Sequence, residues 1–127
     1  MREETQIGQT TMHGRHYQTG APTSVLIESG KIVEVRPYEA PDVDLPWIAP
    51  ALVDVQVNGF GGHDLNSSAT TVEDVRAVAA CLWRGGVGSW CPTITTGSHE
   101  RMVHSLRTVA EACVRDTRLA ASVAGIH

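Results

Sequence analysis

Three polar side chains alternate with valines in the middle of the chain, and their types and spacing could serve hydrolytic chemistry. Asp54, Gln56 and Asn58 interrupt or follow the apolar run from Leu52 to Val57. Residues two apart on a strand share one face, so the intervening valines would take the other. A carboxylate and two amides are poor partners for packed helices. We therefore expect them to face a barrel interior or a wet mouth, where amides can bind a carbonyl or orient a water.

A glycine-rich loop and further histidines surround this segment. Three of the four residues in Gly59–Gly62 are glycine, which lets a ligand approach the backbone closely. His63 and Asp64 follow as a tempting acid-base pair, but neighbours on a strand point apart, so we interpret them as solvated loop residues. His99 and His104 are predicted on different faces of one helix, which argues against a shared metal.

Caps and hydrophobic periodicity predict the elements that position these residues. Thr71 and Asp74 resemble a capping box, and apolar residues then recur at helical spacing until Arg84 and two glycines end the helix. Ser98 predicts the start of a second helix. Apolar runs predict three strands, at 52–57, 87–96 and 119–126. Such alternation of strands and helices is typical of a parallel α/β sheet.

The N-terminal part has a different pattern. Residues 1–23 are polar, contain several glycines and lack an apolar period, so we expect a flexible arm in which His13 and His16 are solvated. The two β-branched runs that follow predict a hairpin, with its turn at Ser29 and Gly30.

Within this hairpin we expect Leu26, Ile32 and Val35 to be buried. Residues 37–46 are rich in proline and acidic residues and predict a connector to the next part of the chain.

Composition restricts the class of protein. The chain has 127 residues, a formal net charge of −4 and a pI near 5.8, which offers no basic patch for nucleic acid. It has no apolar run long enough to cross a membrane and no signal-peptide pattern, so we expect a cytoplasmic protein without a membrane partner. Cys81, Cys91 and Cys113 fit no metal or disulfide spacing and are interpreted as reduced core residues.

Three motifs carry a resemblance to a known family. They are the strand and glycine loop from Ile48 to Asn66, the run S-W-C-P-T-I-T-T at Ser89–Thr96, and the final Gly125-Ile126-His127. In this order, over residues 25–127, the chain resembles the N-acetylglucosamine-6-phosphate deacetylases of the amidohydrolase superfamily. Gln56 and Asn58 stand where most of the superfamily has a metal-binding His-x-His pair, a variant typical of its one-metal deacetylases.

The resemblance implies an α/β fold, the N-terminal part of a (β/α)8 TIM-barrel amidohydrolase preceded by a hairpin of a small β-sandwich domain. The implied division is a flexible arm at 1–23, part of the sandwich domain and connector at 24–47, and a first β-α-β-α-β portion of the barrel at 48–127. A complete barrel takes roughly 250 residues. We therefore expect an incomplete barrel in a truncated chain that is inactive alone.

The resemblance also implies the chemistry: metal-dependent hydrolysis of an amide, giving glucosamine 6-phosphate and acetate. Gln56, Asn58 and His127 would lie near the site, with His127 matching a motif histidine. The metal ligands (a glutamate and two histidines) and the acid-base aspartate are expected downstream, so we assign no catalytic or metal-binding residue here. The resemblance implies a divalent metal, zinc or similar, in full-length members, and we expect this fragment to bind no metal. Family members are often homo-oligomers.

Two alternatives stay open. The parent could be another amidohydrolase that acts on a cyclic amide or a different N-acyl sugar. The chain could instead be a non-catalytic remnant or an interaction module that docks on a complementary fragment.

Overall fold

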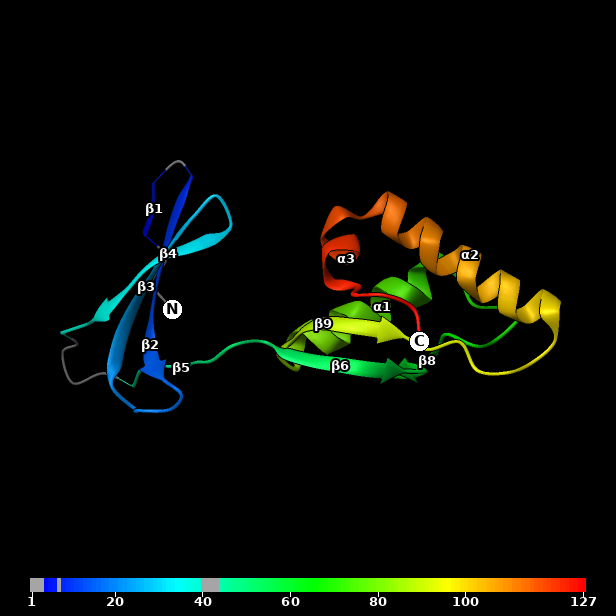
Figure 1. Cartoon of the computed structure of the whole chain (residues 1–127), viewed down its shortest axis with the longest axis horizontal. Coiled ribbons are helices and arrows are strands. Elements are labelled where there is room, and N and C mark those ends of the chain that lie inside the picture. The colour runs from blue at the N-terminus through cyan, green and yellow to red at the C-terminus, as the bar shows by residue number, and fades with distance from the viewer. Residues whose placement is uncertain (1–3, 7, 40–43) are drawn as a thin grey trace. The chain divides into compact units, whose positions relative to one another are not determined.

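The structure is a computed structural model and describes residues 4–6, 8–39 and 44–127 (Figure 1). It divides into two compact units, Met1–Pro50 and Ala51–His127. The described residues of the first unit form strands without helices. The second unit combines strands with helices, in agreement with the α/β class. No helix within the described ranges is both long and apolar enough to cross a membrane.

The first unit is one sheet. Its strands are β1 (Glu4–Gln6), β2 (Gln9–His16), β3 (Pro22–Glu28), β4 (Lys31–Pro37) and β5 (Trp47–Ile48). The first four follow one another as antiparallel neighbours, and β5 pairs with β2 in parallel. The predicted hairpin is confirmed as β3 and β4. Ser29 and Gly30 join them with φ angles of +49° and +75°, as a tight two-residue turn requires.

The predicted flexible arm is wrong for Gln9–His16, which forms β2 and pairs along its length with β3. Backbone hydrogen bonds on both sides hold this strand, so it needs no apolar alternation of its own. Gly14 allows β5 to approach, because a Cβ there would lie 2.5 Å from both Ile48 Cγ1 and the Pro46 carbonyl oxygen. Residues 1–3 and 7 of the arm, and 40–43 of the connector, lie outside the described residues.

Burial in this sheet differs from the expectation. Val25 is buried and Leu26 is half-buried, but Ile32 and Val35 are 65% and 57% exposed. The reason is the position of β4, which pairs only with β3 in the described sheet and carries exposed residues along its whole length.

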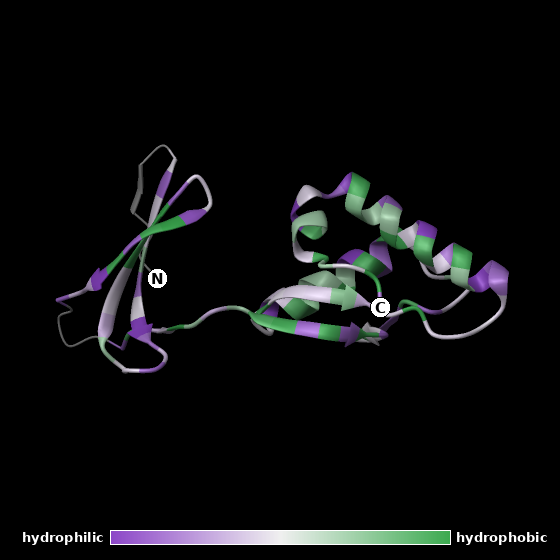
Figure 2. Cartoon of the chain, in the orientation of Figure 1, coloured by the Kyte–Doolittle hydropathy of each residue, from purple (hydrophilic) through white to green (hydrophobic). Residues whose placement is uncertain are grey.

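The second unit packs helices against a parallel pair of strands. Its elements are β6 (Leu52–Val57), β7 (Gly59–Phe60), β8 (His63–Asp64), α1 (Val72–Arg84), β9 (Val87–Pro92), α2 (His99–Arg115) and α3 (Thr117–Ser122). β6 and β9 run parallel and are connected through α1, while β7 and β8 form a small antiparallel ribbon. Figure 2 shows α2 alternating between apolar and polar residues, as expected for a helix with one face on a core.

Both predicted helices are confirmed together with their caps. Thr71 and Asp74 form a complete capping box at the start of α1, and Gly85 follows its last residue. The Ser98 side chain accepts a hydrogen bond from the Arg101 amide at the start of α2. The predicted apolar stripe of α1 is buried and includes Val75 and Val78, both fully shielded from solvent. Periodicity and capping therefore located these helices closely.

The predicted third strand at 119–126 is wrong in its first half, where Leu119–Ser122 belongs to α3. Asp116 starts this helix by accepting a hydrogen bond from the Leu119 amide at 3.0 Å, and alanines favour the helical state. Only the remaining residues are extended. Val123 forms a parallel bridge with Trp90, and the His127 amide donates to the Pro92 carbonyl at 3.0 Å.

Trp90 occupies the centre of the core of the second unit and is fully buried. Its indole Nε1 donates to the Ser122 hydroxyl at 3.1 Å, and that hydroxyl donates to the Leu119 carbonyl at 2.8 Å. The hydrogen bond between Trp90 and Ser122 therefore holds α3 against β9 inside the apolar core.

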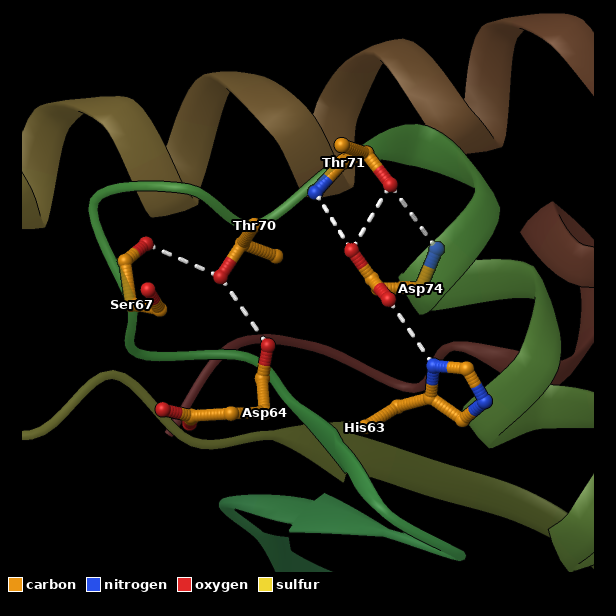
Figure 3. Close-up of polar contacts among 6 residues, drawn as sticks. All are labelled: His63, Asp64, Ser67, Thr70, Thr71 and Asp74. Carbon is orange, nitrogen blue, oxygen red and sulfur yellow. Dashed lines mark hydrogen bonds and ion pairs between the residues drawn. The ribbon is translucent and has the colours of Figure 1, made fainter.

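His63 and Asp74 form a second polar contact, between β8 and the first turn of α1 (Figure 3). His63 Nδ1 lies 2.8 Å from Asp74 Oδ1, so the interpretation of His63 as a solvated loop residue is wrong. Hydrogen bonds from His63 and then Thr71 lower the pKa of Asp74 from 3.8 to about 2. His63 thus supports the cap of α1 rather than pairing with Asp64.

Replacing Ser122 with alanine should destabilise the protein, because it leaves the buried indole N–H of Trp90 without its acceptor. We expect a loss of about 1–3 kcal/mol in unfolding free energy, measured by urea denaturation. Ser105→Ala is the matched control, since the Ser105 hydroxyl is also buried but has no hydrogen-bond partner among the described residues. Equal effects of the two substitutions would contradict this role of Ser122.

Stability should also fall in acid as Asp74 is protonated. Because the pKa of Asp74 is lowered in the folded state, its contribution is complete above about pH 4 and is lost as the pH falls through about 2. Thermal melting between pH 5 and pH 2 should show this loss in the parent chain, and Asp74→Asn should flatten it. Glu73→Gln, an exposed change in the same helical turn, should leave the pH dependence intact.

Candidate functional site

The carboxyl ends of β6 and β9 and the last residues of the chain lie side by side. The Thr93 amide donates to the Val57 carbonyl at 2.8 Å, and the Ile94 amide donates to the His127 carbonyl at 2.8 Å. The residues that follow these three segments therefore share one edge. Ligands of parallel α/β sheets bind outside this edge, which makes it the candidate site.

Gln56 and Asn58 are both exposed at or near this edge, as a role in binding requires. Asp54 is half-buried, and its Oδ1 accepts a hydrogen bond from the Gln56 amide at 3.1 Å. Asp54 therefore fixes the local backbone.

The expected division of the β6 faces is correct only in part. Val57 is buried, but Val53 and Val55 are 65% and 66% exposed, because β9 is the only strand beside β6 among the described residues. A cavity of about 320 Å³ is lined by Asp54 and Gln56 together with residues of α1. Part of the polar side of β6 thus lies beside a helix, contrary to the expectation. The register of β6 against β9 also shifts between Asp54 and Val57, which disturbs strict alternation.

Asn66 is the most highly connected polar residue at this edge, although the sequence motif indicates no role for it. Its Nδ2 donates to the Asn58 carbonyl at 3.1 Å and to the Thr93 carbonyl at 2.9 Å. Its Oδ1 accepts from the Thr95 amide at 2.8 Å. One side chain therefore bonds to the residues that follow both β6 and β9.

Arg101, in the first turns of α2, strengthens the same connection. Its guanidinium donates to the Asn66 carbonyl at 2.7 Å and to the Thr95 carbonyl at 2.7 Å. No spacing rule identifies either Asn66 or Arg101 in advance, because the contact joins residues that are far apart in sequence.

His127 lies at the same edge of the sheet. Its ring Nδ1 is 3.4 Å from the Thr93 hydroxyl, and the residue is exposed. Thr95 and Thr96 are exposed beyond the end of β9, which stops at Pro92 rather than reaching Thr96. His104 is placed elsewhere, with its Nε2 2.9 Å from the Thr70 carbonyl.

Metal ligands do not gather in this part of the protein. Among the described residues, no three His, Cys, Asp or Glu side chains come together in a way that could hold an ion. A catalytic divalent metal normally needs three protein ligands and an open position. The described residues therefore do not fit such a metal by themselves, and the edge offers amides, hydroxyls and one imidazole.

The chain is similar in sequence to two curated deacetylases. It is 32% identical over 83 residues to an N-acetylgalactosamine-6-phosphate deacetylase of Escherichia coli O157:H7, covering 65% of this chain and 22% of that protein. It is 35% identical over 88 residues to an N-acetylglucosamine-6-phosphate deacetylase of Danio rerio, covering 68% of this chain and 21% of that protein. The chain thus spans about a fifth of the length of these relatives. No protein-family model matches it.

Solved structures show the same fold. The N-acetylglucosamine-6-phosphate deacetylase of Thermotoga maritima aligns with a TM-score of 0.68 at 24% identity, over 91% of this chain and 30% of that one. The Pasteurella multocida enzyme of the same name gives a TM-score of 0.63 at 19% identity, over 84% and 31% of the two chains.

A Mycobacterium smegmatis deacetylase, solved in complex with N-acetyl-D-glucosamine-6-phosphate, gives a TM-score of 0.65 at 22% identity, over 94% of this chain and 32% of that one. The predicted resemblance is therefore confirmed: the chain is similar in sequence and fold to part of the N-acetylglucosamine-6-phosphate deacetylases.

Proposed function

We propose that this chain forms the first strands and helices of the barrel of a deacetylase that hydrolyses the acetamide of an N-acetylated amino-sugar phosphate. The observation that carries the proposal is the edge formed by β6 and β9, where Asn66 links Asn58 to Thr93 and the Thr93 hydroxyl lies beside His127. Related proteins at 32% and 35% identity bear the names of such deacetylases.

The exposed amides define what this edge can do. Gln56 and Asn58 carry both donors and acceptors and are uncharged, so they can bind the carbonyl of an acetamide or orient a water without moving a proton. The Thr95 and Thr96 hydroxyls, also exposed there, suit the hydroxyl groups of a sugar. These amides and hydroxyls therefore suit binding and orientation, whereas proton transfer needs a titratable group.

The remaining machinery is assigned to the part of such a deacetylase that this chain does not span, since the chain covers about a fifth of its curated relatives. We propose that a divalent metal, zinc or similar, and the acid-base aspartate are held there, in line with the resemblance. This division explains how a metal-dependent enzyme could contain a segment without a cluster of metal ligands. It also implies that the 127-residue chain alone is inactive. The cytoplasmic location and an oligomeric assembly stay predictions.

A second substrate has support of its own. The Escherichia coli O157:H7 relative is named for N-acetylgalactosamine 6-phosphate, which differs from the glucosamine compound in the configuration of one hydroxyl. Another N-acyl sugar phosphate is therefore the specific alternative, ahead of a cyclic amide. A non-catalytic interaction module is the outcome to accept if no sugar is hydrolysed.

The proposal can be tested by completing the barrel. By itself, the chain should release no acetate from N-acetylglucosamine 6-phosphate. It should release acetate when it is expressed together with a polypeptide that carries the remaining strands of a related deacetylase. Gln56→Ala should then lower turnover on the order of 10²-fold, the typical cost of removing one oriented hydrogen-bond donor. Its melting temperature should stay nearly unchanged because Gln56 is exposed.

Gln18→Ala is the control for this substitution, since Gln18 is an exposed glutamine in the other unit. The same assay with N-acetylgalactosamine 6-phosphate separates the two sugars. Full activity of the Gln56→Ala complex would remove the assigned role. Absence of hydrolysis with either sugar in a folded complex would contradict the proposed function itself.

A further inference from the structure

Asn66 lies between the two strands that end at the candidate site. It contacts Asn58 and Thr93 through their backbone, and Thr95 through both its backbone amide and its hydroxyl. We propose that Asn66 is a positioning residue, whose carboxamide joins the ends of β6 and β9 and thereby fixes the place of Asn58. This inference rests on the proposed function for its catalytic consequence. We call the hydrogen bonds from this carboxamide to Asn58, Thr93 and Thr95 the Asn66 bridge.

The donor half of the Asn66 bridge acts on the two strand ends. Nδ2 donates to the Asn58 carbonyl at 3.1 Å and to the Thr93 carbonyl at 2.9 Å. An amide nitrogen has two hydrogens, so both contacts can be made at once. The Asn58 carbonyl also accepts from the Leu65 amide at 3.0 Å, so two donors fix this peptide group.

The acceptor half acts on the segment after β9. Oδ1 accepts from the Thr95 amide at 2.8 Å, and Arg101 Nη1 lies 3.3 Å from the same oxygen. Arg101 also donates to the carbonyls of Asn66 and Thr95. Arg101, at the start of α2, therefore holds both Asn66 and Thr95, one of the three partners of the bridge. The half-buried Asn66 carboxamide is hydrogen-bonded at its nitrogen and at its oxygen.

The loop between Asn58 and Asn66 explains why such a bridge is needed. Gly61 and Gly62 adopt φ angles of +62° and +90°, and glycine loses the most conformational freedom on folding. At Gly59 an added Cβ would lie 2.4 Å from the His63 carbonyl oxygen, so the ribbon of β7 and β8 closes tightly there. The Asn66 bridge connects the end of this glycine-rich loop to its first residue, Asn58.

Three substitutions separate the two halves of the bridge. Asn66→Ser removes both halves. Asn66→Asp keeps an acceptor for the Thr95 amide but presents oxygen to the Asn58 and Thr93 carbonyls, so it removes only the donor half. Ser68→Ala, at an exposed position in the same loop, is the matched control.

The first experiment uses selective labelling, because Asn58 and Asn66 are the only two asparagines in the 127-residue chain. With ¹⁵N-asparagine, the spectrum of the chain contains backbone and side-chain signals from these two residues alone. Asn66→Ser should remove the Asn66 signals, so that only those of Asn58 remain, and it should shift the backbone and side-chain signals of Asn58. Asn66→Asp should shift these Asn58 signals as well. Ser68→Ala should move neither.

Hydrogen exchange of the uniformly labelled chain tests the acceptor half. The Thr95 amide should exchange about tenfold faster in Asn66→Ser, in proportion to the loss of one hydrogen bond, and should recover in Asn66→Asp. The proposal would be overturned if the Thr95 amide of the parent chain were not protected from hydrogen exchange. It would also be overturned if neither substitution shifted the Asn58 signals.

The second experiment measures turnover in the completed barrel described above. Asn66→Asp should lower kcat about tenfold or more with little change in KM, because substrate still binds but Asn58 is misplaced. Unchanged kcat together with shifted Asn58 signals would reduce Asn66 to a structural residue and refute the positioning role. If even the parent complex is inactive, the proposed function fails, while the spectra of the chain still decide whether Asn66 fixes Asn58.

Discussion

The second unit depends on the burial of Trp90. Its ring fills the core, its indole nitrogen bonds to Ser122 of α3, and its backbone lies between β6 on one side and Val123 on the other. Three segments distant in sequence are thereby brought into line, and the residues just beyond each of them form the candidate site. The geometry of the polar, exposed edge that follows β9 is therefore set by the buried Trp90 side chain, which lies within that strand. The core and the candidate site are therefore coupled, because the packing of the strands in the core determines where the loops that follow them lie.

The sequence predicted the helices well because their signals are local. Caps such as Thr71 and Ser98 satisfy amides within the same turn, and a stripe of buried valines repeats within a few residues. The hairpin turn at Ser29 and Gly30 was predictable for the same reason. The resemblance, which rests on short motifs, is confirmed at the level of the family and the fold, whereas the roles of Gln56, Asn58 and His127 stay predictions.

The errors arose wherever distant partners decide the structure. β2 has no apolar alternation and exists because β3 offers it a row of hydrogen bonds. Leu119–Ser122 reads as an apolar strand, yet a capping aspartate and a tryptophan from another element hold it as α3. Asn66 carries no signal at all in the sequence, since the hydrogen-bond partners of its side chain lie 8 to 35 residues away. Local patterns therefore predict elements, and the contacts between them require the structure.

The connection between β6 and β9 has a consequence for the order of folding. The β3–β4 hairpin closes through a two-residue turn, so its strands can meet on the timescale of microseconds. The parallel pair must first enclose the glycine loop and all of α1, and closing a longer loop costs more chain entropy before any contact forms. During synthesis the first unit also emerges earlier. Its strands can therefore pair before β9 has been made, and until then the apolar stripe of α1 stays exposed to solvent.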